Sequence, residues 1–516
     1  MHVLGDIPKK GALLYPEKTA LCFEGTSITY RELNTRVNRF ANALMGLGCT
    51  GNDRVAILSE NTNKYMEIYF AAAKAAMSVT PLNFRLSNSE LIHIVNDSEA
   101  TVFIMGEGYE QQSKVLKPEL PGIQKWISLD TRFDDYLDYE DLLAEASGEE
   151  PGIHVGENDL MILMYTGGTT GLPKGVMLSH CNLLTAMHGM IMAYSFARSN
   201  VECFNLPLFH ISLWPVLCTL MTGGRVVIVR RPDIKGILTA IQEEKCTRIV
   251  LVPTLLAWML DFPDFNTFDL SSLREITYAG SPMPPEVVKR CIQQFGNILT
   301  QGYGLTEAAP LGTVLFSEDH AFEGPKAGLL QSIGKEGTMV EIQVFDDQDN
   351  PLEPGAVGEI VIKGKNIMMG YWKNPELTAE TLKGGWLHTG DVGMIDKQGY
   401  IFLKDRKADM IVTGGENVYP KETEEILYEH PAVQECAVVS APDTKWGERV
   451  QAVVVLREHC SVGEKELIDY CKARLAGYKC PKKIEFWETL PKTTVGKILR
   501  REIKQSFWKG QGKMIG

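Results

Sequence analysis

A loop rich in glycine and threonine directly follows a short apolar segment within residues 160–175. The apolar part, Leu160-Met161-Ile162-Leu163-Met164, has the length of one buried strand. The loop then reads Tyr-Thr-Gly-Gly-Thr-Thr-Gly-Leu-Pro-Lys-Gly over residues 165–175. Glycines let the backbone approach a ligand closely, so successive N–H groups can converge on an anion. Threonine hydroxyls add donors and Lys174 adds a charge suited to phosphate, so the segment predicts a polyphosphate-binding loop.

The loop differs from the common P-loop, which has Gly before its lysine and Ser or Thr after it. Pro173 and Gly175 stand at those two positions. On composition alone, an ordinary flexible Gly/Thr turn is an equally good explanation. Other parts of the chain must therefore decide between the two.

Composition sets the class of protein. At 516 residues and 44% hydrophobic composition the chain is long enough for more than one domain. A net charge of −13 argues against nucleic acid or an anionic membrane as the main partner. Eleven cysteines without a C-x-x-C pair fit neither a zinc site nor a disulfide framework. With no secretory signal pattern and no apolar run of about 18 residues, we expect a soluble cytoplasmic protein without a membrane segment.

Strand-like and helical patterns alternate over the first half of the chain, which predicts parallel sheets covered on both faces. The sequence Thr29-Tyr30-Arg31-Glu32 is a capping box that opens a helix closed by Gly46 and Gly48. A second helix is predicted over residues 66–76. Buried strands are predicted over residues 55–58, 102–105, 226–229 and 249–252.

The pattern changes in the second half. From about Ile333 the alternation at residues 340–344 and the strand at 358–362 predict an antiparallel module. After Asp405 a compact α+β segment follows, with a strong strand over residues 450–456. The charged run at residues 404–409 is the predicted domain boundary.

Four further segments can act together with the phosphate loop. In Gln301–Glu307, Tyr303 can stack on a base and Glu307 can hold a Mg²⁺ ion that keeps most of its waters. Asp391 can accept hydrogen bonds from the hydroxyls of a ribose, and Arg406 can donate hydrogen bonds to the same ribose. Lys497 follows a glycine turn near the C-terminus. Taken singly, each has a plainer explanation as a core aromatic, a turn cap or a solvated lysine.

In this order the segments strongly resemble the adenylate-forming superfamily of acyl-CoA synthetases, luciferases and nonribosomal peptide adenylation domains. The resemblance runs from Thr29–Leu33 to Gly496-Lys497. It implies that the residues from Thr166 to Lys174 hold the β- and γ-phosphates and that Tyr303 stacks on adenine. It further implies that Thr306 contacts the α-phosphate and that Lys497 is the catalytic lysine of adenylation.

The resemblance assigns the following positions. The catalytic residues are Lys497, Thr306, Glu307 and His210, with Glu307 as the metal ligand. The nucleotide- and cofactor-binding residues are Thr166, Gly167, Gly168, Thr169, Thr170, Gly171, Lys174, Gly280, Ser281, Tyr303, Gly304, Asp391, Arg406, Gly414 and Gly415. The acyl-pocket residues are Phe209, His210, Trp214, Gly302 and Ala308.

Two positions depart from the family pattern. Gly167 stands where serine is commoner, so one side-chain donor to phosphate is lost. Ala408 stands at a frequent hinge position that usually carries Asp or Lys. A small residue can still absorb a change of backbone angles, but the family's hinge energetics do not transfer directly.

The implied fold is an α/β protein of two domains. Residues 1–404 would form a large domain of two α/β subdomains and a β module, and residues 405–516 a small mobile α+β domain. The implied reaction has two halves. A carboxylate attacks the α-phosphate of MgATP to give an acyl-adenylate and pyrophosphate, and a thiol then takes the acyl group and releases AMP.

Coenzyme A is the expected thiol, because no carrier-protein domain follows Gly516. A stand-alone adenylation enzyme that loads a separate carrier protein remains open, as does a luciferase-type oxygenase. A catalytically silent nucleotide sensor is the alternative from another class. A homodimer is also left open.

The expected acid is a monocarboxylate with an apolar body, either aromatic or a medium- to long-chain fatty acid. Apolar side chains surround His210, and no Arg or Lys occurs between Asn205 and Gly224 to pair a second carboxylate. Several of these side chains are equally explained as plain core.

Overall fold

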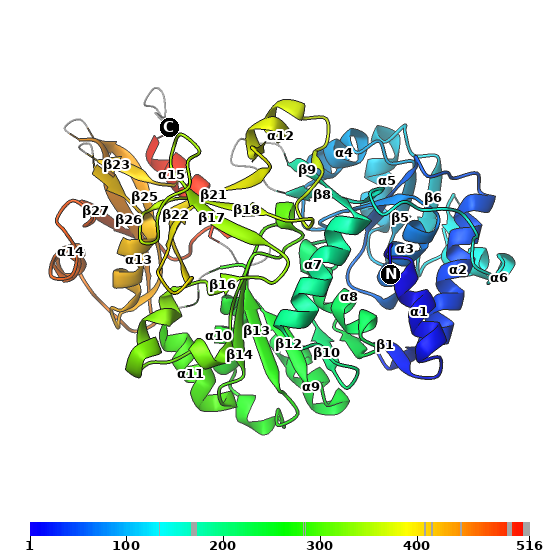
Figure 1. Ribbon diagram of the computed structural model, residues 1–516, viewed down its shortest axis with the longest axis horizontal. Helices are drawn as coiled ribbons and strands as arrows, with labels where there is room; N and C mark the ends of the chain where they lie inside the picture. Colours follow the sequence, from blue (N-terminus) through cyan, green and yellow to red (C-terminus); the bar gives the residue numbers. More distant parts are fainter. Residues whose placement is uncertain are drawn as a thin grey trace.

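The computed structural model describes residues 1–133, 135–166, 173–281, 283, 285–406, 409–413, 416–443, 446–492 and 498–508, and of residues 405–406 and 416–417 the backbone alone. Over these residues, no helix combines the length and the apolarity needed to cross a bilayer. Figure 1 shows a large part of the chain, coloured blue to yellow, beside a smaller C-terminal part in orange and red. The two parts are built on different sheets.

The first large sheet is mostly parallel and carries the β8–β9 hairpin that flanks the predicted phosphate loop. In spatial order its strands are β19 (Gly370–Tyr371), β9 (Lys174–Ser179), β8 (Leu160–Thr166), β4 (Ser78–Pro81), β3 (Arg54–Leu58), β5 (Val102–Met105), β6 (Lys125–Ser128) and β7 (Leu137–Asp138). The helices of this region are α1 (Asp6–Leu14), α2 (Tyr30–Gly46), α3 (Asn63–Lys74), α4 (Asn88–Asp97), α5 (Glu110–Leu116) and α6 (Tyr139–Glu145). The late strand β19 joins this sheet antiparallel to β9.

The second large sheet is parallel at its centre and antiparallel at both ends. In spatial order its strands are β16 (Lys335–Glu336), β15 (Thr313–Leu315), β14 (Leu299–Tyr303), β13 (Glu275–Ala279), β12 (Arg248–Leu251), β10 (Val201–Phe204), β11 (Arg225–Ile228), β1 (Thr19–Phe23) and β2 (Thr26–Thr29). Its helices are α7 (His180–Ala193), α8 (Trp214–Met221), α9 (Ile234–Glu244), α10 (Pro253–Leu260) and α11 (Pro285–Phe295). The α/β class with two α/β subdomains is thereby confirmed.

Side-chain alternation explains why each large sheet is covered on both faces. In β3, Val55 and Ile57 belong to a central core shared by both sheets. Their neighbours Ala56 and Leu58 belong to a second cluster with α4 and α5. The same period of two divides β12, where Val250 faces the central core while its neighbours pack toward α9, α10 and α11.

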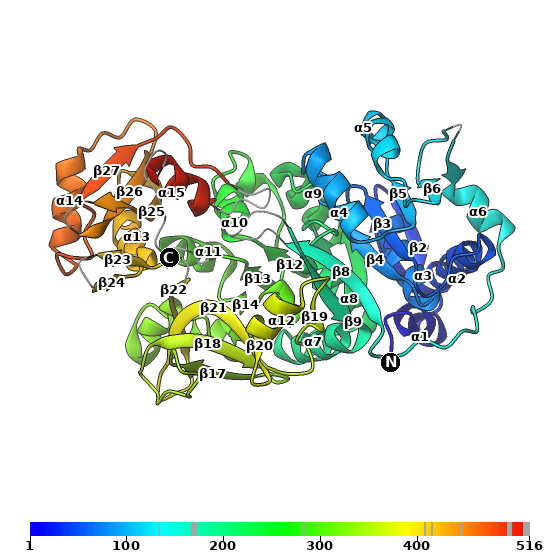
Figure 2. The same ribbon diagram turned by 90° about the horizontal axis from the view of Figure 1, so that it is seen from above.

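The predicted antiparallel module is confirmed as a third sheet. Its strands are β17 (Glu341–Phe345), β18 (Gly358–Lys363), β21 (Trp386–Ile395), β20 (Leu382–Lys383) and β22 (Ile401–Arg406), with helix α12 (Pro375–Thr381) beside them. All of its strand pairs are antiparallel. Figure 2 shows β17, β18 and β21 side by side along one edge of the molecule.

The C-terminal part has its own sheet and its own buried apolar clusters. Its elements are β23 (Ile411–Thr413), β24 (Glu416–Val418), α13 (Pro420–Tyr428), β25 (Val433–Asp443), β26 (Gly447–Leu456), α14 (Glu464–Lys472), β27 (Lys483–Phe486) and α15 (Arg500–Trp508). Asp405 and Arg406 still pair with β21 of the third sheet, and Ile411 already belongs to the C-terminal sheet. The change of sheet therefore falls between residues 406 and 411.

Local sequence patterns predicted the bounds of several helices and strands to within a few residues. Both hydrogen bonds of the Thr29–Glu32 capping box are present at the start of α2. Helix α3 begins at Asn63, three residues before the predicted start, because the Thr62 side chain accepts from the Tyr65 backbone N–H and caps the helix there.

Candidate active site

The carboxyl ends of β13 and β14 bring the predicted adenine-binding residues together. The two strands are parallel neighbours, and Ala279 pairs with Gly302 at their ends. Gly280 follows with a φ of +91°, a conformation that favours glycine. Gly280 and Ser281 therefore leave β13 beside Tyr303, at the edge where ligands bind to open α/β sheets.

Tyr303 and Asp391 meet although they lie on different sheets. The Tyr303 hydroxyl donates to Oδ2 of Asp391 at 2.6 Å. Asp391 is only 8% exposed. The residue predicted to stack on the base and the residue predicted to bind the ribose thus form one connected surface.

The backbone around Asp391 is held by a short network. Its N–H donates to the Thr389 hydroxyl at 3.0 Å, and that hydroxyl donates to the Ile360 carbonyl at 2.6 Å. Arg406 lies directly opposite Asp391 in the β21–β22 register. The backbones of the two predicted ribose residues are therefore neighbours across the strand pair, while the Arg406 side chain lies outside the described residues.

Glu307 is positioned by contacts from β19 and from the segment just before it. Its Oε1 accepts a hydrogen bond of 2.8 Å from the Tyr371 hydroxyl, and its carbonyl accepts from the Met368 N–H at 2.8 Å. Tyr371 pairs with Val176 of β9, the strand that begins at Lys174. The Lys174 ammonium lies 5.6 Å from the centroid of the Tyr371 ring. Tyr371 thus joins the metal-ligand candidate to the cation of the phosphate loop.

Burial, and then the charge of Glu307, raise the pKa of Tyr371 well above its usual value. The phenol therefore remains protonated at neutral pH and continues to donate to the carboxylate. This hydrogen bond uses one oxygen of Glu307, so the second oxygen remains for a ligand.

The donors around Glu307 fit Mg²⁺ but not a metal held by protein ligands alone. Among the described residues, no group of three or more His, Cys, Asp or Glu side chains could hold a metal ion. Mg²⁺ commonly binds through one or two carboxylates and completes its shell with phosphate oxygens and water. Glu307 beside the phosphate-loop lysine matches that pattern.

The loop that carries Glu307 requires glycine at one position. A Cβ at Gly304 would lie 1.5 Å from the Pro310 carbonyl oxygen. The chain folds back through Ala309, which has a left-handed φ of +56°, and buries Thr306 and Ala308. The tight turn therefore fixes Thr306 and Glu307 next to Tyr303.

The predicted acyl-pocket residues come from β14, from the turn that follows it and from the segment between β10 and α8. His210 is the N-terminal cap of the 3₁₀ turn Ile211–Leu213, where its Nδ1 accepts from the Ser212 N–H at 3.3 Å. Phe209 is buried and packs edge to face on Phe84, with ring centroids 5.3 Å apart. Ala308 is fully enclosed, and Trp214 is buried at the start of α8.

Part of the predicted site lies outside the described residues. Thr166 and Lys174 are paired across the β8–β9 hairpin at the two ends of the loop. The predicted residues outside the described ranges are Gly167, Gly168, Thr169, Thr170, Gly171, Gly414, Gly415 and Lys497.

The sequence analysis missed two tyrosines that contact predicted site residues. Tyr371 contacts Glu307, and Tyr194 stacks on Trp214 with ring centroids 5.4 Å apart. The only sequence signal for Tyr371 is the aromatic pair Tyr371-Trp372 after a glycine. Tyr194 follows a helix as one aromatic among many, and its contact arises only in the folded chain.

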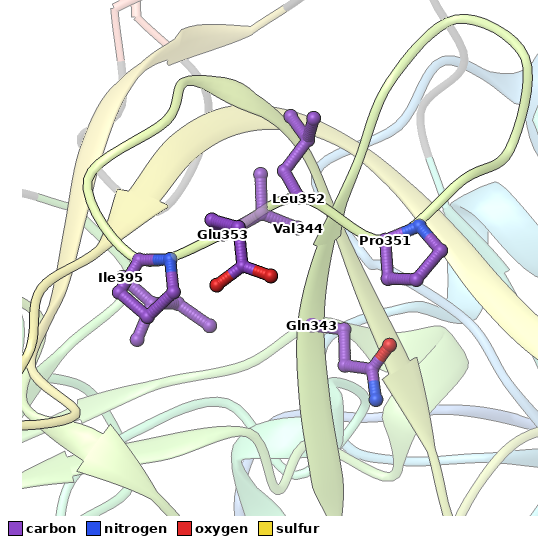
Figure 3. Close-up of a pocket in the computed structure, with 7 residues that line it drawn as sticks. Gln343, Val344, Pro351, Leu352, Glu353 and Ile395 are labelled. Carbon is purple, nitrogen blue, oxygen red and sulfur yellow. The ribbon is translucent and has the colours of Figure 1, made fainter.

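A hollow of about 300 Å³ lies away from these residues, between β17 and the end of β21 (Figure 3). Its lining includes Leu352 and Pro351 from the turn-rich segment that follows β17. It contains none of the predicted site residues, so it has no part in the chemistry considered below.

Comparisons with known proteins agree with this arrangement. The AMP-binding enzyme family model matches residues 9–372, and the AMP-binding enzyme C-terminal domain matches residues 422–497. A feruloyl-CoA synthase of Amycolatopsis is 38% identical over 98% of this chain and 99% of that protein. A long-chain-fatty-acid–CoA ligase of Mycobacterium tuberculosis is 34% identical over 98% of this chain and 99% of that protein. The solved structure of an anthranilate CoA ligase in complex with anthranoyl-AMP matches with a TM-score of 0.89 and 27% identity, over 98% of this chain and 97% of that one.

Proposed function

Because the chain belongs to the AMP-binding enzyme family and is an ATP-dependent acid–thiol ligase, we propose that it joins an aromatic monocarboxylic acid to coenzyme A. The juxtaposition of Tyr303 with Asp391, beside the Glu307 loop, carries the nucleotide half of this proposal. The 38% sequence identity to a feruloyl-CoA synthase supports an aromatic acid as the substrate. The buried aromatic side chains of Phe209 and Trp214 support it as well.

In the first half-reaction, a carboxylate oxygen of the acid bonds to the α-phosphorus of ATP, and the bond to the bridging oxygen of pyrophosphate breaks. Tyr303 would support the adenine face, while the carboxylate of Asp391 accepts from the ribose hydroxyls. Lys174 would hold the outer phosphates, and Glu307 would hold Mg²⁺, which neutralises phosphate charge when it is bound. The protein's contribution is therefore positioning and charge neutralisation.

In the second half-reaction, the sulfur of coenzyme A bonds to the acyl carbon, and the bond from that carbon to the adenylate oxygen breaks. AMP leaves and the thiol loses its proton. We propose that residues 405–516 reorient between the two steps, so that Lys497 serves the first step and the strand at Gly414-Gly415 the second. The separate sheet and cores of the C-terminal part support such a movement.

A panel of acids tests the proposal. Purified protein is given ATP, Mg²⁺ and coenzyme A with ferulate, cinnamate, benzoate, palmitate, malonate or succinate, and AMP and thioester are measured. We expect an aromatic acid to have the highest kcat/KM. The kcat/KM of each dicarboxylate should be at least tenfold lower than that of the preferred aromatic acid. Burying an unpaired second carboxylate costs about 2 kcal/mol or more.

Two results would contradict the proposal. A higher kcat/KM for palmitate than for every aromatic acid would assign the pocket to fatty acids. Formation of AMP only when a holo acyl-carrier protein replaces coenzyme A would assign a different thiol.

A further inference from the structure

Tyr194 is held rigidly against a predicted acyl-pocket residue. It follows α7 and is only 4% exposed. Its ring stacks on Trp214, which in turn contacts Phe196 edge to face. The Tyr194 carbonyl accepts a hydrogen bond of 2.7 Å from Nη1 of Arg248. The ring is thus held on one face by Trp214, and its backbone is held by Arg248.

The Tyr194 hydroxyl extends to Gly302, a second predicted pocket residue. A Cβ built on Gly302 would lie 2.6 Å from this hydroxyl oxygen. Any side chain at position 302 would therefore displace the hydroxyl. Because Gly302 precedes Tyr303 at the end of β14, the hydroxyl lies close to the nucleotide-binding loop.

No hydrogen-bond partner for the Tyr194 hydroxyl occurs in the part of the chain that the structure describes. Most enclosed tyrosine hydroxyls of this protein do have one. Examples that donate to another residue are Tyr30, Tyr69, Tyr139, Tyr278 and Tyr371. In contrast to the Tyr65 oxygen, the Tyr194 oxygen is not one of the fully enclosed polar atoms without a partner, so it is not closed off from a ligand.

The unused hydroxyl has the properties of a ligand-binding group. Ligand pockets are mostly apolar, with a few polar groups that fix the orientation of the ligand. Burial, and then the nearby Glu275, raise the pKa of Tyr194 well above its usual value. The hydroxyl therefore keeps its proton and is able to donate at neutral pH.

We propose that Tyr194 is a specificity-determining residue, whose hydroxyl donates a hydrogen bond to a hydroxyl or methoxyl oxygen on the ring of an aromatic acid. This inference rests on the proposed function and adds the substituent class to it. Trp214 holds the ring of Tyr194 in place, and Gly302 leaves the space that the hydroxyl needs.

Tyr194→Phe tests the inference because it removes only the hydroxyl. The kcat/KM for 4-hydroxy-3-methoxycinnamate should fall by about 5- to 15-fold, the effect of one lost neutral hydrogen bond. The kcat/KM for unsubstituted cinnamate should change by less than about twofold. Wild-type protein should also prefer 4-hydroxycinnamate to 4-methylcinnamate, which has a similar shape but cannot accept the bond.

Tyr65→Phe is the matched control. The Tyr65 hydroxyl is buried and also has no partner among the described residues, but it lies on α3 against Tyr69. This variant should leave the ratio of the two cinnamates unchanged. A change in that ratio as large as the one in Tyr194→Phe would show that loss of any buried hydroxyl is sufficient, and would overturn the inference.

The remaining outcomes are distinct. An unchanged substrate ratio in Tyr194→Phe, or an equal loss with both cinnamates, would overturn the role of Tyr194 and leave the proposed function intact. Wild-type protein that forms thioester from fatty acids alone would overturn both, and this result appears before any variant is made.

Discussion

Tyr371 positions Glu307 and lies beside Lys174, so one side chain links the metal and phosphate parts of the site. A hydrogen bond to one carboxylate oxygen restricts rotation of the carboxylate and leaves the other oxygen for a ligand. Partners of metal ligands commonly change metal affinity by 10- to 100-fold when they are removed. Tyr371 is thus expected to act on the metal through Glu307.

Tyr371→Phe should raise the Mg²⁺ concentration that half-saturates ATP–pyrophosphate exchange by about tenfold, with a smaller effect at saturating Mg²⁺. Glu307→Gln, which loses the charge itself, should also lower the rate at saturating Mg²⁺. A magnesium titration of both variants separates the two effects.

Tyr139→Phe is the control for this titration, because Tyr139 donates to the Glu67 carboxylate at 2.8 Å in a similar tyrosine–glutamate pair on the helices beside the first sheet. Its Mg²⁺ dependence should equal that of wild type. An unshifted midpoint in Tyr371→Phe would show that Tyr371 does not position the metal ligand.

Neighbouring strands place three charged residues side by side in the second large sheet. Glu202 of β10 pairs with Arg248 of β12, which pairs with Glu275 of β13. Arg248 binds Glu275 at 2.6 Å, whereas its Nε lies 3.7 Å from Glu202, whose two oxygens have no hydrogen-bond partner within the described residues. Burial raises the pKa of the Glu202 carboxyl to about 8.

Glu202→Gln should therefore become more stable relative to wild type as the pH rises from about 5 to 8. Folded wild type keeps the Glu202 proton up to about pH 8, whereas the unfolded chain releases it near its usual pKa. Wild type loses stability across this window by linkage, and glutamine cannot ionise. Between pH 5 and pH 8, we expect the unfolding free energy of wild type to fall by about 3 kcal/mol relative to that of Glu202→Gln.

Urea unfolding at pH 5, 6.5 and 8 measures this effect, and the comparison with wild type at each pH is its internal control. Parallel stability curves for the two proteins would mean that Glu202 titrates alike in the folded and unfolded states.

Elements with local signals could be predicted from sequence. The capping box at Thr29 and the alternation at residues 340–344 depend on neighbours in the chain, and both elements formed as expected. The joining of β1 and β2 to the second sheet, and of β19 to the first, depends on partners more than 190 residues away. Such pairings leave no periodicity in the sequence, so neither they nor the tyrosines Tyr371 and Tyr194 could be foreseen.

The whole molecule joins two units that have separate cores. Contacts from β22 to α13 include Lys404 to Glu422 at 3.4 Å and Lys421 to the Leu403 carbonyl at 3.1 Å. These are polar contacts at the junction, and such interfaces permit relative domain motion more readily than large apolar ones. The proposed reorientation of residues 405–516 would occur around this junction.

Lys497→Ala should separate the two half-reactions. Negative charge builds on the phosphate oxygens during adenylation, and removing one stabilising group there commonly costs about 10²- to 10³-fold in rate. Thioester formation from synthetic acyl-adenylate and coenzyme A should remain close to the wild-type rate. Equal losses in both reactions would show that Lys497 is structural or that the C-terminal part does not reorient.

The most direct test of the acyl-adenylate route is the transfer of oxygen from acid to AMP. Aromatic acid labelled with ¹⁸O in its carboxylate is converted with ATP and coenzyme A, and the AMP is analysed by mass spectrometry. Carboxylate attack on the α-phosphorus, followed by thiol attack on the acyl carbon, predicts one ¹⁸O atom in each AMP. Unlabelled AMP, or ¹⁸O in inorganic phosphate with ADP as the nucleotide product, would contradict the proposed route.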